Sequence, residues 1–323
     1  MKRPNEMPNE IIKSNRRSFL AQTAAASLGF SLAPALGIAA EAKTAIGFAF
    51  SLYGMKSLKL AEALRACSKI GYDGVELTLT PGWHAEPKLL SQKRRRELRS
   101  LLESLGLKLP GLMENIHLNV ENAKHRANLD RLKAAAELAR DLSPKQPPVI
   151  ETVLGGRPGQ WESIKDAMAL RLVDWTKIAE EMKITLALKA HVSGAVHTPQ
   201  AALWLMRQAD SPQVRLNYDY SHFQLRKIPL VESLKLMLPH TVFIHIKDSR
   251  GDAKNVRFLL PGEGDTNYRQ YLALLKKSAY RGFVCVEVSG QIHGKKGYDP
   301  VETARRCYRT MAPIFAQAGI QRR

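Results

Sequence analysis

The stretch ITLALKAHV, residues 184–192, has the pattern of a buried strand that ends in polar side chains. An isoleucine and two leucines occupy alternate positions, and side chains at alternate positions of a strand share one face. Lys189 and His191 therefore lie together on the other face, at the carboxyl end of the strand. An ammonium and an imidazole at that place predict a polar site at one end of a sheet.

Two periodicities alternate along the chain after its first 44 residues. Short apolar runs typical of strands are each followed by a longer stretch with helical periodicity. The expected strands are 45–50, 73–79, 107–113, 148–154, 184–190, 214–219, 241–246 and 282–288. The expected helices are 57–71, about 89–105, 125–142, 161–182, 199–209, about 229–238, 267–278 and 300–318. Eight such units predict a single-domain α/β protein with a (β/α)₈ barrel, a fold that typically takes about 250 residues. A doubly wound open sheet is the alternative, but no Gly-rich dinucleotide turn follows the first strand.

The alternation of side chains sorts the other strands into two faces as well. One face is apolar, as in Val75, Leu77 and Leu79, and suits contact with surrounding helices. The opposite face ends in ionisable residues on six strands: Glu76, Glu151, Lys189, Asp219, His245 and Glu287. Active sites of (β/α)₈ barrels assemble at the carboxyl ends of the strands. The sequence therefore predicts a ring of ionisable groups around one polar mouth.

Carboxylates and imidazoles that converge in a pocket are donors for a divalent metal ion. Asp219, His245 and Glu287 are the natural ligands, and their oxygen and nitrogen atoms suit Mn²⁺, Co²⁺, Mg²⁺ or Zn²⁺. His222 follows Asp219 in DYSH and is expected to reach substrate or metal, while Lys247 in HIKD borders the mouth. The Gly-rich turn PGEGD can cradle a ligand, or simply turn the chain into a helix capped by its aspartate or the following threonine.

Residues 1–42 have the layout of a twin-arginine (Tat) export signal. Arg16 and Arg17 precede a weakly apolar, alanine-rich stretch, and cleavage is expected after Ala42. A short membrane anchor is the alternative, but the stretch is interrupted by a proline and spans a bilayer poorly. We therefore expect a signal peptide over 1–42, a barrel over 43–323, the Tat export machinery as a partner and a periplasmic location.

The charge and the cysteines narrow the classes of function. The formal net charge is +19, but the basic residues are scattered over amphipathic segments and are not interleaved with aromatic residues that stack bases. We read them as solvated helix faces and expect no nucleic-acid partner. The three cysteines, Cys67, Cys285 and Cys307, lack CxxC spacing, so buried, inert thiols are expected.

Several motifs carry a family resemblance. They are IGYDGVEL (70–77), DYSH (219–222), HIKD (245–248), PGEGD (261–265) and YRGFVCVEVSG (280–290). In this order and on these strands, they resemble the xylose-isomerase-like TIM barrel superfamily, which includes sugar phosphate isomerases and epimerases and AP-endonuclease-type barrels. The resemblance covers roughly residues 45–318, essentially the whole chain after the signal.

The resemblance implies a metal site with one departure. In sugar epimerases of this superfamily, Glu, Asp, His and Glu on strands five to eight hold the metal, and the two glutamates act as acid/base groups. The last three of these ligands map onto Asp219, His245 and Glu287, but the first falls on Lys189. An ammonium has no lone pair, so Lys189 is not a metal ligand unless it is neutral.

Three interpretations of Lys189 remain open. In the first interpretation, Lys189 is a structural cation paired with Glu151, in a site that has lost its metal. Alternatively, Glu151 supplies the missing ligand, and Lys189 is a general acid/base or a clamp on a substrate oxyanion. In the third interpretation, Lys189 forms a Schiff base with a carbonyl sugar. The predicted metal ligands are thus Glu151, Asp219, His245 and Glu287, and the predicted catalytic residues are Lys189, Glu151 and Glu287.

Other residues around the mouth are candidates for substrate binding. They are His222, His191, Lys247, Glu76 and Trp83. An aromatic such as Trp83 can stack on a sugar ring, with packing against the barrel rim as the alternative. His191 can bind a sugar hydroxyl or make a structural hydrogen bond. Glu114 follows the third strand and can face the pocket or solvent.

These features predict a metal-assisted carbohydrate enzyme, an isomerase or epimerase that removes a proton next to a carbonyl. Elimination from 3-keto-glycosides, a lyase reaction, shares the same first step and is the alternative. Because phosphorylated sugars are largely cytoplasmic, export favours a non-phosphorylated carbohydrate substrate. A non-catalytic sugar-binding barrel is a further alternative. An AP-endonuclease-like nuclease is disfavoured, because no D-x-H pair follows HIKD.

Overall fold

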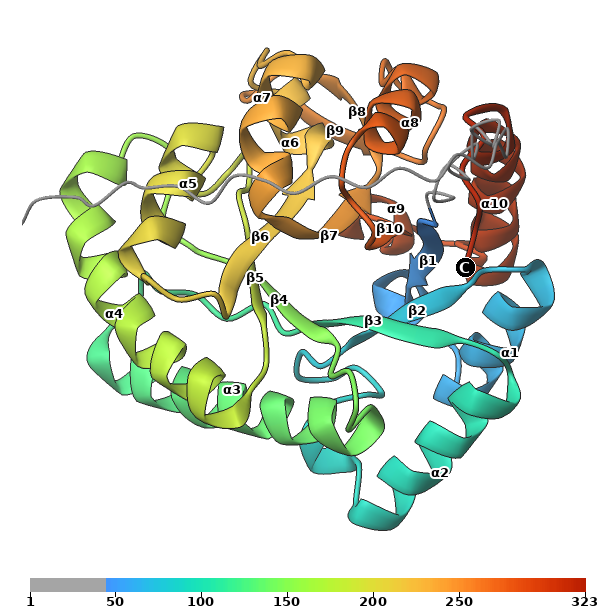
Figure 1. The fold of residues 1–323 in the computed structure, drawn as a ribbon, viewed down its shortest axis with the longest axis horizontal. Coiled ribbons are helices and arrows are strands. Elements are labelled where there is room, and N and C mark those ends of the chain that lie inside the picture. Colours follow the sequence, from blue (N-terminus) through green and yellow to red (C-terminus); the bar gives the residue numbers. More distant parts are fainter. Residues whose placement is uncertain (1–44) are drawn as a thin grey trace, which may run out of the picture. The chain divides into compact units, whose positions relative to one another are not determined.

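The computed structural model describes residues 45–323, and the predicted export signal over 1–42 lies outside these described residues. Eight parallel strands form a closed barrel, in the order β1-β10-β7-β6-β5-β4-β3-β2 (Figure 1). The strands are β1 (Gly47–Ser51), β2 (Gly74–Thr78), β3 (Lys108–Met113), β4 (Val149–Val153), β5 (Leu186–Lys189), β6 (Val214–Asp219), β7 (Thr241–Ile246) and β10 (Phe283–Val286). The predicted (β/α)₈ barrel is confirmed.

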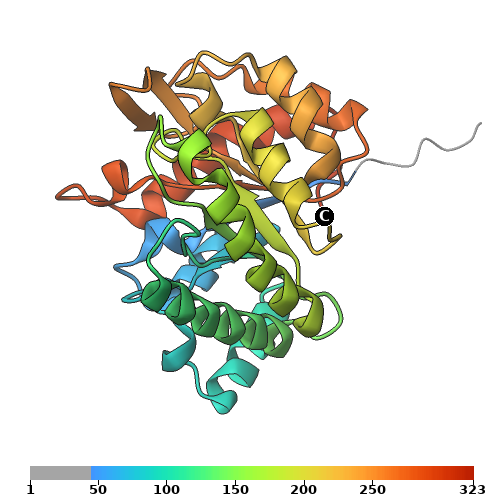
Figure 2. The same cartoon turned by 90° about the vertical axis from the view of Figure 1, so that its left-hand side faces the viewer.

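Helices surround the barrel and alternate with its strands along the chain. They are α1 (Leu60–Ile70), α2 (Gln92–Ser104), α3 (Asn122–Leu142), α4 (Trp161–Met182), α5 (Pro199–Gln208), α7 (Leu230–Met237), α8 (Tyr268–Lys277) and α10 (Pro300–Gln317). Figure 2 shows the long helices α3 and α4 side by side on the outside. Predicted and observed ends differ by at most three residues. Within the described part of the chain, no helix is both long and apolar enough to cross a membrane.

Shorter elements fill the connections between strands and helices. They are η1 (Leu52–Met55), η2 (Pro87–Leu89), α6 (Tyr220–Gln224), η3 (Leu238–His240) and α9 (Gly290–His293). Side-chain caps fix where several helices begin: Thr198 accepts the N–H of Ala201 at α5, and Asp299 accepts two N–H groups at α10. The three cysteines of the chain are free and buried, as predicted.

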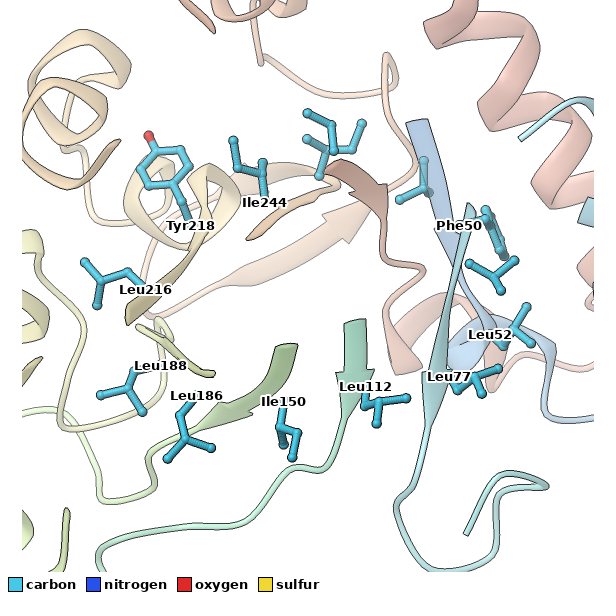
Figure 3. Packing of buried hydrophobic residues seen from close by; sticks show 14 of the residues in the cluster. Phe50, Leu52, Leu77, Leu112, Ile150, Leu186, Leu188, Leu216, Tyr218 and Ile244 are labelled. Carbon is cyan, nitrogen blue, oxygen red and sulfur yellow. The ribbon is translucent and has the colours of Figure 1, made fainter. Parts of the chain in front are cut away.

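The apolar face of each strand packs outward against the helices. Figure 3 shows Leu77, Leu186, Leu188, Leu216 and Ile244 pointing away from the barrel axis into this layer. All five side chains are buried. The opposite faces therefore point into the barrel, where the polar residues at the strand ends meet. The alternation that the sequence predicts for the strands is present in the fold.

A hairpin interrupts the seventh strand–helix unit, and the sequence did not predict it. β8 (Asp248–Gly251) and β9 (Val256–Leu259) pair antiparallel between β7 and α8. The Oδ2 atom of Asp248 accepts the N–H of Gly262, and Oδ1 accepts that of Thr266, so this carboxylate holds the PGEGD turn against β8. The expected helix cap was wrong: α8 is capped by Asn267, not by Asp265 or Thr266.

A second set of polar contacts closes the amino-terminal end of the barrel. Arg322 donates to Oδ1 of Asp73 at 2.6 Å and to Oδ2 at 2.9 Å. Oδ2 of Asp73 also accepts the N–H of Phe48 on β1, at 2.8 Å. Arg322 further donates to the hydroxyl of Tyr308 on α10. These bonds tie β1, the start of β2 and α10 together at the end opposite the polar mouth.

Candidate active site

A cavity of about 360 Å³ lies at the carboxyl ends of the barrel strands. It is lined by Tyr53, Asn115, His117, Val153, Gly155, Gly156, Lys189, His191, Ser193, Gly194, His222, Lys247, Phe258, Glu287, Ser289 and Gly290. Its size is within the range of small-molecule sites, and its position is where enzymes of this fold carry out their chemistry. Five predicted site residues lie on its wall: Lys189, His191, His222, Lys247 and Glu287.

Lys189 enters the centre of the ring from the end of β5. Its Nζ donates to Nδ1 of His245 at 3.0 Å and lies 3.4 Å from both carboxylate oxygens of Glu287. It also lies 3.4 Å from Oε2 of Glu151 on the neighbouring strand β4. The side chain is only 2% exposed. The ammonium of Lys189, at the end of an otherwise apolar strand, is therefore surrounded by two carboxyl groups and an imidazole.

Lys247, two residues after His245, places a second ammonium in the ring. Its Nζ donates to Oδ2 of Asp219 and, at 2.6 Å, to Oε2 of Glu287. Ser221 holds the other oxygen of Asp219, with its hydroxyl donating to Oδ1 at 2.6 Å. Lys247 is thus a buried bridge between the carboxylates at the ends of β6 and β10.

His245 joins the ring to Glu76 beneath it. Its Nε2 lies 3.1 Å from both oxygens of Glu76, which is fully buried in the middle of β2. Burial lowers the pKa of this imidazole, whereas Glu76 and Glu287 raise it to about 9, which favours a second proton. The contact at Nδ1 opposes that proton, because an ammonium 3.0 Å away needs a lone pair. We therefore place the proton on Nε2, toward Glu76.

The ammonium and carboxyl groups shift each other's ionisation. Burial raises the pKa of Glu287, but Lys189 and Lys247 outweigh it and hold this pKa well below its usual range. Burial lowers the pKa of Lys189, but Glu151 and Glu287 outweigh it and raise this pKa. Lys189 is therefore a cation and Glu287 an anion at neutral pH. Burial raises the pKa of Glu151, whose Oε1 has no hydrogen-bond partner among the described residues.

Two neutral imidazoles stand on the wall above the ring. The rings of His191 and His222 are 4.2 Å apart between centroids. Burial lowers the pKa of both groups, so they are uncharged at neutral pH. Nδ1 of His191 accepts the N–H of Ser193, which leaves Nε2 as the donor. Nε2 of His222 lies 3.4 Å from Oδ2 of Asp219.

The remaining candidates lie outside the wall of the cavity. Trp83 stacks on Tyr53 with 5.3 Å between ring centroids, so it supports a cavity residue from behind. Glu114 pairs with Arg131 of α3 at 2.6 Å. Glu76 and Glu151 are fully buried below the residues that line the cavity.

Several residues of the site were missed in the sequence. Asn217 donates to Oε2 of Glu151 at 3.2 Å, and its Nδ2 lies 3.3 Å from Nδ1 of His245. It precedes Asp219 by two residues, so strand alternation alone places it in the barrel. Tyr53 and Phe258 also line the cavity. Phe258 comes from the hairpin, for which no sequence signal was recognised.

The ring contains groups that are chemically able to bind a metal ion. Ligand atoms of Asp219, His245 and Glu287 lie within 4.8 Å of one another, and those of Glu76, His245 and Cys285 do so as well. Oxygen and nitrogen donors of the first set suit a divalent ion.

The two ammonium groups compete for the same donor atoms. Lys247 contacts Asp219 and Glu287, and Lys189 contacts Glu287 and His245. A divalent ion about 4 Å from an ammonium is repelled by about 8 kcal/mol at an effective dielectric constant of 20. As folded, with both lysines charged, the donor set does not fit a divalent ion.

Comparisons with known proteins agree with this architecture. The model of the family described as "Xylose isomerase-like TIM barrel" matches residues 64–311. The rhizopine catabolism protein MocC of Rhizobium meliloti is 26% identical over 212 residues, which cover 57% of this chain and 63% of that protein. An inosose dehydratase of Bacillus thuringiensis is 26% identical over 143 residues, which cover 40% and 47%. The chain thus spans less than two thirds of the length of either relative.

Solved structures share the fold at low sequence identity. The IOLI protein with a bound zinc atom has a TM-score of 0.69 and 20% identity, and the match covers 84% of this chain and 99% of that one. The 3-keto-D-glucoside 4-epimerase of E. coli has a TM-score of 0.65 and 15% identity, with the same two coverages.

Proposed function

The chain belongs to the xylose isomerase-like TIM barrel family, and on this basis we propose that it is a carbohydrate enzyme that removes a proton next to a carbonyl. The observation that carries the proposal is the ring at the floor of the cavity. There, the anionic carboxylate of Glu287 lies between two buried ammonium groups, Lys189 and Lys247. A base beside fixed positive charge suits the formation of an enolate.

In the proposed reaction, Glu287 accepts the proton from the carbon next to the carbonyl. The electrons of the C–H bond form the carbon–carbon double bond, and the carbonyl oxygen becomes an oxyanion held by Lys189 and Lys247. As the ammonium groups turn from Glu287 to the oxyanion, the carboxylate becomes more basic. Glu151 and Asn217 position Lys189 from behind. Protonation of the other face by a second acid gives epimerisation, and return of the proton from Glu287 to the adjacent carbon, with a proton moved between the two oxygens, gives isomerisation.

Elimination is the second candidate, and the pair of imidazoles favours it. Neutral His191 or His222 can donate a proton to a leaving group at the next carbon, after the same proton removal. The names of relatives include both kinds of reaction, a dehydratase and an epimerase. A non-catalytic sugar-binding barrel remains the alternative to both.

We propose a substrate without a phosphate group. Among the described residues that line the cavity there is no arginine, and both lysines are already paired with carboxylates. A phosphate would need further cations, because both lysines are assigned to the reacting oxygen in the proposed reaction. Hydroxyl and imidazole groups such as Tyr53, Ser289 and His191 instead suit the hydroxyls of a free sugar, a cyclic polyol ketone or a glycoside.

The sequence also predicts export, which stays a proposal, and a divalent ion, which the donor set as folded does not fit. The ion would be held by Glu151, Asp219, His245 and Glu287, with Mn²⁺, Co²⁺, Mg²⁺ and Zn²⁺ as candidates.

Export by the Tat machinery would place the enzyme in the periplasm. Replacement of Arg16 and Arg17 by lysine should retain the protein in the cytoplasm, as measured by cell fractionation.

Incubation with keto sugars and 3-keto-glycosides in D₂O tests the proposed reaction. Deuterium on the carbon next to the carbonyl, detected by NMR, is the expected result. A new stereocentre or a shifted carbonyl then indicates epimerisation or isomerisation, and release of water or an aglycone indicates elimination. Absence of both exchange and turnover across the panel, with and without added Mn²⁺, would leave the sugar-binding alternative.

A further inference from the structure

We propose that the cation of this site is the pair of ammonium groups of Lys189 and Lys247, which take the place of a divalent metal ion. The wild-type protein then takes up no divalent ion at Asp219, His245 and Glu287. This inference rests on the proposed function in one respect, which is that the ammonium groups stabilise a substrate oxyanion. Whether a metal binds can be measured without any substrate.

The first support is the identity of the atoms that the lysines contact. Lys247 bridges Oδ2 of Asp219 and Oε2 of Glu287, the two carboxylates that a metal ion at this place would have to bridge. Lys189 takes the lone pair of His245 Nδ1, at 3.0 Å. Every residue of the donor set therefore already holds an ammonium.

The second support is burial, because both ammonium groups are almost completely shielded from solvent. Lys189 is 2% exposed and Lys247 is 4% exposed. A metal ion that displaced them from Glu287, Asp219 and His245 would leave two buried charges without these partners. Lys189 would keep only Glu151 as an ionic partner and Lys247 would lose both of its carboxylates, and a buried charge that loses such partners is strongly unfavourable.

The third support is that the two ammonium groups lie where the proposed chemistry needs positive charge. Both line the cavity, and both contact Glu287, the proposed base. A substrate oxygen that binds to either Nζ therefore lies next to the group that removes the proton. Fixed donors of this kind stabilise an oxyanion without a metal.

Metal titration of wild type and Lys189→Glu tests the inference. The substitution removes two units of positive charge, which a divalent ion would restore, and adds a carboxylate on β5. After treatment with EDTA and dialysis, Co²⁺ is added and its visible absorption is recorded, and Tm is measured with Mn²⁺. We expect no saturable Co²⁺ spectrum for wild type. For the variant, we expect a saturable spectrum and a Tm raised by roughly 5 °C at a hundredfold excess of ion over Kd.

Three further variants make the test decisive. Lys145→Glu makes the same change of charge on an exposed loop before β4, at the other end of the barrel, and should behave like wild type. Lys189→Gln removes the ammonium and adds only a neutral amide oxygen, so it should bind Co²⁺ more weakly than Lys189→Glu. Lys189→Gln also serves if Lys189→Glu does not fold. Saturable Co²⁺ binding to wild type overturns the inference, and so does a folded Lys189→Glu/Lys247→Met double variant, without either ammonium group, that binds no metal.

Failure of this inference and failure of the proposed function give different results. A wild-type protein that binds Co²⁺ tightly and exchanges deuterium would refute the ammonium pair and keep the enzyme. A wild-type protein that binds no metal and exchanges no deuterium on any sugar would refute the enzyme and keep the ammonium pair as the cation of the site.

Discussion

Glu287 is the residue at which the contacts of the ring converge, since Lys189, Lys247 and His245 all lie against its carboxylate. In Glu287→Gln the amide cannot accept the substrate proton. We expect deuterium exchange to fall roughly 10²–10⁴-fold, as is usual when a general base is lost. NMR of the product in D₂O measures this loss, with circular dichroism to verify the fold.

Glu302→Gln is the matched control for that loss. Glu302 pairs with Arg305 and Arg309 on the exposed face of α10, so the same chemical change should leave exchange at the wild-type rate. Exchange by Glu287→Gln within a factor of about two of wild type would assign the base to another residue.

The raised pKa of Glu114 predicts that the free energy of unfolding depends on pH. Burial raises the pKa of Glu114 to about 7, although Arg131 opposes the shift, and Oε2 has no hydrogen-bond partner among the described residues. In the unfolded chain the group ionises near its ordinary pKa of about 4.3. Between these pH values the folded state binds more protons, so stability falls as pH rises through this window, by at most roughly 4 kcal/mol.

Glu114→Gln should remove this part of the pH dependence. Urea unfolding at pH 5 and pH 8 measures it, as the difference in free energy of unfolding between the two pH values. We expect the difference to be smaller in the variant than in wild type. Equal differences would mean that Arg131 keeps Glu114 ionised in the folded protein down to its ordinary pKa.

Strand alternation explains why so much of the ring was predictable from single residues. Glu76, Glu151, Lys189, Asp219, His245 and Glu287 each occupy the inward parity of their strands, and the barrel brings them together. Strand alternation does not show which side chains of the ring pair with one another. Which carboxylate each ammonium contacts depends on the register between strands and on side-chain conformation, and neither is encoded in local periodicity.

At the scale of elements, one carboxylate joins the β8–β9 hairpin to the turn that follows it. Asp248 accepts the N–H groups of Gly262 and Thr266, and a side chain at Gly264 would collide with it, with a Cβ 2.6 Å from Oδ1. Asp248→Ala should cost roughly 2–4 kcal/mol, because two hydrogen bonds to a charged group are lost. Urea unfolding measures this cost.

The same substitution should loosen the wall of the cavity. The hairpin carries Phe258, whose ring lies 5.1 Å from Nζ of Lys247. The backbone N–H of Phe258 donates to the side chain of Gln291 on α9. In Asp248→Ala we expect faster amide hydrogen exchange over residues 256–266 and a higher KM. Asp248→Asn keeps an acceptor oxygen and should recover part of both effects. Unchanged exchange in the alanine variant would mean that other contacts hold the turn.

The hairpin also marks the limit of element prediction. The eight helices and eight barrel strands have regular apolar periodicity, because each buries one face against the other layer. The segments DSRG and VRFL have no such pattern, because much of the hairpin lies outside the core. Its position depends on Asp248 and Gln291, which are distant in sequence from the atoms that they bind.

At the scale of the whole molecule, Arg322 helps to close the barrel on the side away from the cavity. Arg322→Ala removes bonds to Asp73 and Tyr308, which link β1, β2 and α10. We expect a loss of about 2 kcal/mol, and a Tm lower by roughly 4 °C, with turnover unchanged. Arg96→Ala, at an exposed position of α2, should leave Tm unaltered. A change in turnover with an unaltered Tm would contradict this assignment.

The place of Lys189 in the ring bears on how barrels of this kind diverge. Lysine and glutamate codons differ only in their first base, so a single mutation exchanges an ammonium for a carboxylate at the end of β5. The polar contacts of this inward side chain are with Glu151 of β4, His245 of β7 and Glu287 after β10, so the frame of the barrel need not change with it. On the proposal that ammonium groups replace the metal here, one such mutation would be a step between enzymes that depend on dissolved metal and enzymes that do not.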